Sequence, residues 1–280
     1  MKHTIIIGAG YTGSTCAHAL RSVGELVTVL DKARGPGGRC SRRRAVVNGQ
    51  DVVWTHGAHH IDTDHPLFAD CDDPHAVIRS LVEPAIFSTH VREIQLPQRG
   101  VNVVCDDGIV HHADRVLVTI PVPQFLALPL VGSTIQPTLI QDLHSIQYSS
   151  RIAFLLAGTN ITDALLKGAA PPKSEIRWHI TEESISVLTI LAPPSWSEQH
   201  LEASLSDLAS TTEATLVRSG ATIAACHVHR WRYAQPRQQS TIGPIVDCSG
   251  DGRILLAGDA FGLDAWKAVS LHTPFTPSTS

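Results

Sequence analysis

The most constraining feature of the sequence is a glycine-rich turn, Gly8-Ala9-Gly10-Tyr11-Thr12-Gly13, which directly follows a run of β-branched residues at 4–7. Such a run predicts a strand that is buried on both faces. Apolar residues recur at helical spacing through residues 14–22, and residues 26–30 predict a second buried strand that ends in Asp31. A strand, a glycine turn, a helix and a second strand are the βαβ arrangement that binds dinucleotides.

Each part of this arrangement has a physical role in binding. Gly8 allows the tight turn, Gly10 lets a pyrophosphate approach the backbone, and Gly13 lets the helix and strand pack closely. The start of the helix offers free N–H groups and the positive end of its dipole to phosphate. Asp31 comes 23 residues after Gly8, near the spacing of roughly 20 expected for a carboxylate that binds ribose hydroxyls. The alternative, glycines of ordinary turns, does not explain this combination.

A second glycine-rich segment, Lys32-Ala33-Arg34-Gly35-Pro36-Gly37-Gly38-Arg39, follows Asp31. An NAD domain does not need this segment. FAD does, because the longer cofactor extends beyond the first turn and a second loop must pass close to its phosphates and ribityl chain. Gly37 and Gly38 permit that approach, and Arg39 can make a forked, charge-assisted contact to phosphate. The segment therefore predicts FAD as the cofactor.

Composition excludes several classes of protein. The 22 Lys and Arg residues do not outnumber the 26 Asp and Glu residues, so no cationic surplus is available for nucleic acid or anionic lipid. No apolar run approaches the roughly 18 residues of a membrane-spanning helix. The six cysteines are scattered without a C-x-x-C pair, which favours a reducing, cytoplasmic location. The sixteen histidines show no recognisable ligand spacing, so we expect no metal site.

These residues resemble the renalase family of flavoprotein oxidoreductases, which are related to the amine oxidases. Residues 31–39 are close to a signature of that family. Further segments resemble the family in the same order along the chain: His56-Gly57-Ala58-His59-His60-Ile61, 116–124, 148–151, 195–197, 230–234 and 256–262.

The resemblance implies an α/β fold, in which a Rossmann-like FAD-binding domain of the amine-oxidase (GR2) type is interleaved with an α+β substrate domain built on a mostly antiparallel sheet. The expected ranges are 1–65, 75–122 and 240–270 for the FAD-binding domain, 66–74 and 123–239 for the substrate domain, and 271–280 for a loose C-terminal tail. The cofactor-binding residues that it implies are Gly8, Gly10, Thr12, Gly13, Asp31, Lys32, Gly38, Arg39, His59, His60, Val91 (through its backbone, to adenine) and Asp259 (near the ribityl chain).

The activity that the resemblance implies is oxidation of dihydronicotinamide isomers of NAD(P)H, with molecular oxygen as electron acceptor. A substrate that itself donates a hydride needs no general base, so we assign no catalytic residue. One alternative is an FAD-dependent amine oxidase or small-molecule dehydrogenase. Another is a truncated protein that is non-catalytic or binds FAD weakly. We expect a monomer or homodimer without nucleic-acid or membrane partners.

Two features depart from the family pattern. Only a short segment, 66–74, separates the Gly-Ala segment from a helix expected at 73–82, where relatives have additional residues. After Gly258-Asp259 the family has a closing helix that faces the flavin phosphates, whereas Pro274 and Pro277 are incompatible with a helix interior. Elsewhere we expect a hairpin at 101–112, buried strands at 115–120 and 254–257, and further strands at 151–157, 176–181 and 184–192. A single helix is expected at 198–219.

Overall fold

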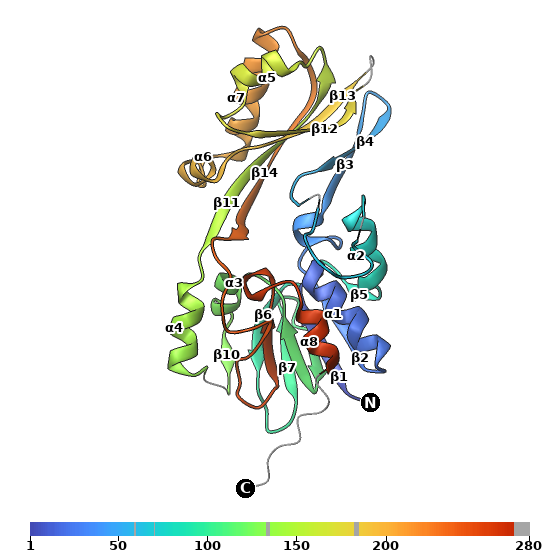
Figure 1. Ribbon diagram of the computed structural model, residues 1–280, viewed down its shortest axis with the longest axis vertical. Coiled ribbons are helices and arrows are strands. Elements are labelled where there is room, and N and C mark those ends of the chain that lie inside the picture. Colours follow the sequence, from blue (N-terminus) through green and yellow to red (C-terminus); the bar gives the residue numbers. More distant parts are fainter. Residues whose placement is uncertain (59, 70, 133–134, 182–184, 272–280) are drawn as a thin grey trace. The chain divides into compact units, whose positions relative to one another are not determined.

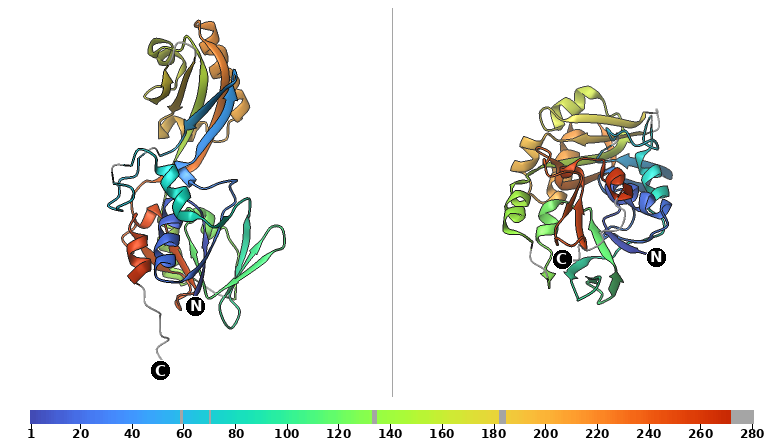
Figure 2. Two further views of the ribbon diagram at one scale, coloured as in Figure 1. Left: turned by 90° about the vertical axis from the view of Figure 1, so that its right-hand side faces the viewer. Right: turned by 60° about the horizontal axis from the view of Figure 1, so that its bottom comes forward.

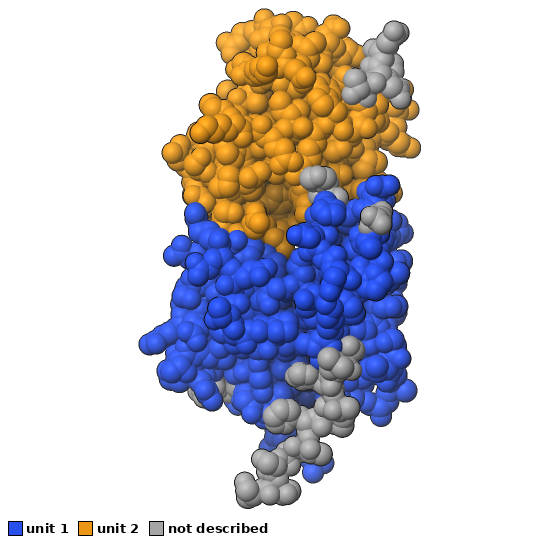
Figure 3. All heavy atoms as spheres, viewed as in Figure 1, with its two compact units in different colours: residues 1–38, 60–147, 236–280 blue, residues 39–59, 148–235 orange. Residues whose placement is uncertain are grey.

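The computed structural model describes residues 1–58, 60–69, 71–132, 135–181 and 185–271 of the protein (Figure 1). The chain forms two compact units, which Figure 3 distinguishes by colour. Unit 1 comprises residues 1–38, 60–147 and 236–280, and unit 2 comprises residues 39–59 and 148–235. The units are interleaved in sequence because the chain enters unit 2 twice.

The central element of unit 1 is a mostly parallel sheet with the strand order β15-β16-β9-β1-β2-β5. Its strands, in that order, are Ile245–Asp247, Ile254–Ala257, Arg115–Val118, His3–Ile7, Leu26–Leu30 and Ala85–Ile86. β1 pairs in parallel with β2 on one side and β9 on the other, whereas β15 is antiparallel to β16. The carboxyl ends of β1, β2, β9 and β16 therefore meet at one edge, which is where open α/β sheets bind ligands.

Helices pack on this sheet because its strands are apolar on both faces. α1 (Tyr11–Ser22) buries Cys16, Ala17 and Leu20 in a core that includes Ile6 and Leu117 from the sheet. α8 (Ala265–Leu271) contributes to the same core and lies beside α1, as Figures 1 and 2 show. The remaining helices of unit 1 are α2 (Pro74–Val82), α3 (Val122–Leu126) and α4 (Pro137–Ser145).

A second sheet in unit 1 has the order β10-β6-β7-β8. Its strands are Leu130–Val131, Val91–Gln95, Val101–Cys105 and Val110–Ala113. The β7–β8 hairpin was expected from Asp106-Asp107-Gly108, and Gly108 has a φ of +84°, a conformation that suits glycine.

Unit 2 contains an antiparallel sheet with the order β12-β13-β11-β14 and a separate hairpin, β3–β4. These strands are Glu175–Thr181, Ser186–Leu191, Tyr148–Thr159, Thr222–Pro236, Arg42–Val47 and Gln50–Thr55. One side of the sheet packs with α5 (Asp163–Ala169), α6 (Pro194–Gln199) and α7 (Leu205–Arg218), and the hairpin contributes to a second core. The expected interleaved fold with an antiparallel second sheet is thus confirmed.

The compact units have different boundaries from the expected domains. Residues 39–59 belong to unit 2 rather than to the nucleotide domain, whereas 66–74 and 123–147 belong to unit 1. The hairpin joins unit 2 because Trp54 is fully buried there and its indole Nε1 donates to the carbonyl of Leu156 at 2.9 Å. Phe68, in turn, packs against Tyr11 of α1 within unit 1.

Two expected features of the secondary structure are wrong. The single helix at 198–219 is two helices, because α6 ends before His200 and Ser204 caps α7 by accepting from the backbone N–H of Asp207 at 3.3 Å. A helix also follows Gly258-Asp259, since α8 packs its Ala265 and Val269 into the core. Of the loose tail expected at 271–280, residue 271 is the last residue of α8, and residues 272–280 lie outside the described residues. No helix in the described part of the chain is long and apolar enough to cross a membrane.

Candidate dinucleotide-binding site

The first glycine turn connects β1 to α1, and its conformation requires residues without a side chain. Gly8 has a φ of +114°, and a Cβ on Gly13 would lie 1.9 Å from the carbonyl oxygen of Gly8. Helix α1 therefore packs against the end of β1 more closely than any other residue at Gly13 would permit. Gly10 is the N-cap of α1, and no described side chain caps this end of the helix. Its first N–H groups are thus left for another acceptor.

Asp31 lies at the end of β2 and holds the first turn. Its Oδ2 accepts from the backbone N–H of Ala9 at 2.6 Å, and its Oδ1 accepts from the N–H of Ala33 at 2.7 Å. Residues 86–89 lie alongside, because the N–H of Thr89 donates to the carbonyl of Asp31 at 2.9 Å. A carboxylate has about four acceptor positions, so two remain for hydroxyl donors of a ligand.

The second glycine segment docks on the first. The backbone N–H of Gly37 donates to the carbonyl of Ala9 at 2.9 Å. Gly38 has a φ of +51°, and a Cβ at this position would lie 3.0 Å from the Cα of Gly10. The two loops consequently approach backbone to backbone at the carboxyl edge of the parallel sheet.

Sequence reasoning missed Thr119, which directly follows β9 and contacts the same turn. Its Oγ1 donates to the carbonyls of Ile7 at 3.0 Å and Gly8 at 3.1 Å. A hydroxyl directly after a buried strand and before Pro121 is the signal that could have indicated it, because such residues end at the ligand-binding edge of the sheet.

The other residues predicted to bind the cofactor differ in burial and in their place in the fold. Thr12 is buried in the first turn of α1, and Val91 is buried at the start of β6. Gly258, with a φ of +152°, follows β16, and Asp259 then begins a 3-10 turn, η2 (Asp259–Phe261). Lys32 and His60 are exposed. His59 lies outside the described residues.

Arg39 is the first residue of unit 2, so the boundary between the units falls within the second glycine segment, in the 3-10 turn η1 (Gly38–Cys40). Its guanidinium Nη1 donates to the carbonyl of Ala234 at 2.7 Å, and its own carbonyl accepts from the N–H of Ala58 at 2.7 Å. Arg39 thereby fastens the Gly57-Ala58 segment to β14 within unit 2.

Unit 2 contains a cluster of rings formed by His56, His229 and Trp231. The centroids of the two imidazoles are 4.5 Å apart, and Trp231 stacks on His56 at 5.3 Å. The indole Nε1 also donates to the carbonyl of His56 at 2.7 Å. Burial, followed by the neighbouring His229 and Arg43, lowers the pKa of His56 to about 3, and burial with Arg43 lowers that of His229 to about 4. Both rings are therefore neutral at physiological pH.

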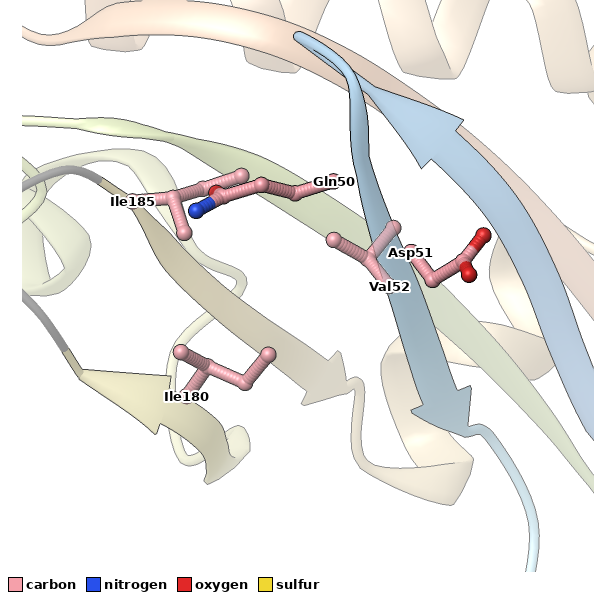
Figure 4. A pocket seen from close by; sticks show the side chains of 5 residues that line it. All are labelled: Gln50, Asp51, Val52, Ile180 and Ile185. Atoms are coloured by element: carbon pink, nitrogen blue, oxygen red, sulfur yellow. The ribbon is translucent and has the colours of Figure 1, made fainter.

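Two other kinds of site can be compared with the glycine loops, a metal centre and a pocket in unit 2. Among the described residues, no group of three or more His, Cys, Asp or Glu side chains is arranged to hold a metal ion. Figure 4 shows a pocket of about 290 Å³ between the β3–β4 hairpin and β12, lined by Gln50, Asp51, Val52, Ile180 and Ile185. This pocket is small and belongs to unit 2, whereas the glycine loops belong to unit 1.

The residues of unit 1 fit an elongated adenine dinucleotide. A Cβ at Gly8, Gly13 or Gly38 would collide with neighbouring atoms, so these positions form a cradle of bare backbone. Asp31 offers acceptors for ribose, and the uncapped start of α1 offers donors for phosphate. The arrangement defines a dinucleotide-binding α/β domain.

Comparison with known proteins identifies this domain more closely. Residues 6–73 match the family described as NAD(P)-binding Rossmann-like domain. A segment of 48 residues is 44% identical to L-amino-acid oxidase of Daboia russelii, covering 17% of this chain and 10% of that oxidase. The match thus spans about a tenth of that relative.

The whole fold resembles that of putrescine oxidase. A redesigned triple mutant of that enzyme superposes with a TM-score of 0.60 at 12% identity, covering 96% of this chain and 95% of the other. Wild-type putrescine oxidase bound to putrescine superposes with a TM-score of 0.58 at 12% identity, covering 96% of each chain. At this identity the similarity concerns the fold.

Proposed function

We propose that the protein is an FAD-dependent oxidoreductase, in which residues of unit 1 provide most of the cofactor contacts and unit 2 is the substrate domain. The observation that carries this proposal is the docking of the second glycine loop on the first, through the Gly37–Ala9 hydrogen bond. A site for a mononucleotide or for NAD alone does not need a second glycine-rich loop at this position. The match to the Rossmann-like family and the fold similarity to putrescine oxidase support the same class.

The residues have distinct roles in this proposal. The N–H groups at the start of α1 bind the pyrophosphate, and Asp31 accepts from the adenosine ribose. Val91, at the start of β6, contacts adenine through its backbone, and Asp259 lies toward the ribityl chain. Gly38 lets the backbone of the second loop come close to the cofactor. Lys32, Arg39, His59 and His60 are further contacts in this proposal. FAD, when bound, accepts a hydride at its isoalloxazine ring, while the protein orients the reactants and excludes competing ones.

For the substrate, we propose a dihydronicotinamide isomer of NAD(P)H that loses a hydride and becomes NAD(P)+. The two electrons and the proton of this hydride, together with one proton from solvent, reduce molecular oxygen to hydrogen peroxide. Charge in unit 2 favours this substrate over an amine. Burial, and after it the guanidinium of Arg43, lowers the pKa of His56, His227 and His229, so a positive charge acts on both imidazoles of the ring cluster. A protonated amine would be repelled there, whereas an electron-rich ring or an anionic dinucleotide would not.

A spectrum and a turnover assay test the proposal. The protein is incubated with excess FAD, desalted and scanned in the visible region, and the flavin is then mixed anaerobically with dihydronicotinamide isomers or with putrescine and L-amino acids. Bound flavin that is bleached by the isomers supports the proposal. Bleaching by amines alone would favour the amine oxidase alternative, which the fold similarity to putrescine oxidase also supports. A protein that retains no flavin, and whose melting temperature does not respond to FAD, would contradict the cofactor assignment.

A further inference from the structure

We propose that Thr119 is a positioning residue for dinucleotide binding, whose hydroxyl fixes the first glycine turn in its binding conformation. This inference rests on the proposed function, because it concerns the same cofactor site. Thr119 directly follows β9, 111 residues after Gly8 in the sequence, yet its Oγ1 donates to the carbonyls of both Ile7 and Gly8. Its backbone N–H also donates to Ile7, at 2.8 Å.

Each of two consecutive peptide units in the turn is hydrogen-bonded on both sides. In the Ile7–Gly8 peptide, Thr119 binds the carbonyl and the N–H of Gly8 donates to Leu30 at 2.9 Å. In the Gly8–Ala9 peptide, Thr119 binds the carbonyl at 3.1 Å and Asp31 binds the N–H at 2.6 Å. Two consecutive peptides are therefore clamped between the ends of β9 and β2, and neither can rotate without breaking a hydrogen bond.

The Thr119 side chain also occupies the space that two glycines leave open. A Cβ on Gly8 would lie 2.7 Å from Oγ1 of Thr119, and a Cβ on Gly13 would lie 2.9 Å from the same atom. The hydroxyl thus sits between the first and third glycines of the turn. At these two positions glycine is needed for the Thr119 contact as well as for turn geometry and helix packing.

Orientation of these peptides matters for an anionic ligand. Rotation of a peptide unit exchanges its N–H and its carbonyl, and a carbonyl oxygen directed at a phosphate is repulsive. Thr119 binds the Ile7 and Gly8 carbonyls on the side of β9, and the Gly8 oxygen lies against Gly13, so protein atoms hold both carbonyls in place. Preorganised donors then meet the pyrophosphate without rearrangement of the turn, which increases affinity.

The test measures FAD affinity by quenching of flavin fluorescence in the full-length protein and in its variants. Thr119→Val keeps the shape of the side chain and removes the donor, Thr119→Ser keeps the donor, and Thr119→Ala serves if the valine variant does not fold. The matched control is Thr28→Val in β2, which removes a hydroxyl bonded to the His3 ring at 2.9 Å. The melting temperature without FAD is recorded for each protein.

We expect Thr119→Val to bind FAD about tenfold more weakly, a loss equivalent to one or two net hydrogen bonds. Thr119→Ser should restore most of the affinity, and Thr28→Val should bind as the wild type does. Equal affinity of wild type and Thr119→Val would overturn the inference and leave the proposed function intact. So would equal weakening in Thr119→Ser and Thr119→Val. Failure of the wild type to bind FAD would instead overturn the proposed function, and this inference with it.

Discussion

The backbone N–H of Gly37 donates to the carbonyl of Ala9 across 2.9 Å, so the second glycine-rich loop is fixed directly on the first. Next to this bond, a Cβ on Gly38 would lie 3.0 Å from the Cα of Gly10. The proposed site therefore depends on contact between two stretches of bare backbone, which makes it sensitive to the addition of single methyl groups.

Gly38→Ala should weaken FAD binding at least tenfold. The φ of +51° at this position costs a residue with a Cβ about 1–2 kcal/mol, and the new methyl group would press on Gly10. Gly35→Ala in the same loop is the matched control, because a Cβ there meets no atom of the described residues within 4 Å. Fluorescence titration with FAD compares the two variants. Similar affinities for both would mean that the approach of the loops is irrelevant to the cofactor.

Asp31→Ala should lower FAD affinity by about 10- to 100-fold, because a charged acceptor that fixes Ala9 and Ala33 is worth about 1.5–3 kcal/mol. Isothermal titration measures the change. Asp107→Ala is the control, since its Oδ1 likewise accepts a backbone N–H, that of Ile109 at 2.9 Å, but in the β7–β8 hairpin. If the control loses as much affinity as Asp31→Ala, general destabilisation accounts for both results.

Acid should destabilise the protein through His56. An unfolded histidine has a pKa of about 6.5, and burial lowers the pKa of His56 to about 3 in the folded state. Below about pH 6.5 the unfolded chain binds the additional proton, so stability falls as the pH decreases toward 3, by at most about 1.4 kcal/mol per pH unit for this group. His229, with a pKa of about 4, acts in the same direction.

Urea unfolding of His56→Phe between pH 4 and pH 8 checks this expectation. The variant should show a shallower loss of stability in acid than the wild type, whereas His144→Phe, at an exposed position on α4, should follow the wild-type profile. Parallel acid profiles for wild type and His56→Phe would show that another group controls acid unfolding.

The segment 61–69 is held on unit 1 by ring packing more than by charge. Phe68 is 2% exposed and its ring lies 5.0 Å from that of Tyr11 in the first turn of α1. Phe68→Ala should cost about 3–5 kcal/mol. The Lys267–Asp64 ion pair is exposed to solvent, which screens it, so Lys267→Met should cost much less stability than Phe68→Ala. Chemical denaturation of both variants measures the difference, and a larger loss in Lys267→Met would refute this ranking.

The local elements of the nucleotide domain follow from short-range rules. A β-branched run predicts β1, glycines with fixed spacing predict the turn, and apolar periodicity predicts α1, because each of these signals acts over a few residues. Several residues of the candidate site in unit 1 are close in sequence, so these short-range signals also place them close together in the structure. The position of Asp31 at the site follows from one additional rule, that parallel strands have their carboxyl ends at the same edge of the sheet.

Other features could not be derived in this way. The expected helix at 198–219 is interrupted because Ser204 caps a new helix, and a cap competes with continuation of a helix in a way that periodicity alone does not reveal. The helix α8 forms because α1 offers an apolar surface on which Ala265 and Val269 pack. The prolines that argued against a closing helix lie downstream of α8.

The βαβ unit with its glycine turn, the second glycine loop and the acid that ends the second strand can all be predicted from the amino-acid sequence. The Gly37–Ala9 hydrogen bond, the contacts of Thr119 with the turn, and the packing of the β3–β4 hairpin in unit 2 through Trp54 became known from the folded chain. This difference arises because the interactions act over different ranges in sequence. Turn geometry and helix periodicity act between neighbours in sequence, whereas burial of apolar surface and satisfaction of buried polar groups select partners as far apart as Arg39 and Ala234, which are separated by 195 positions.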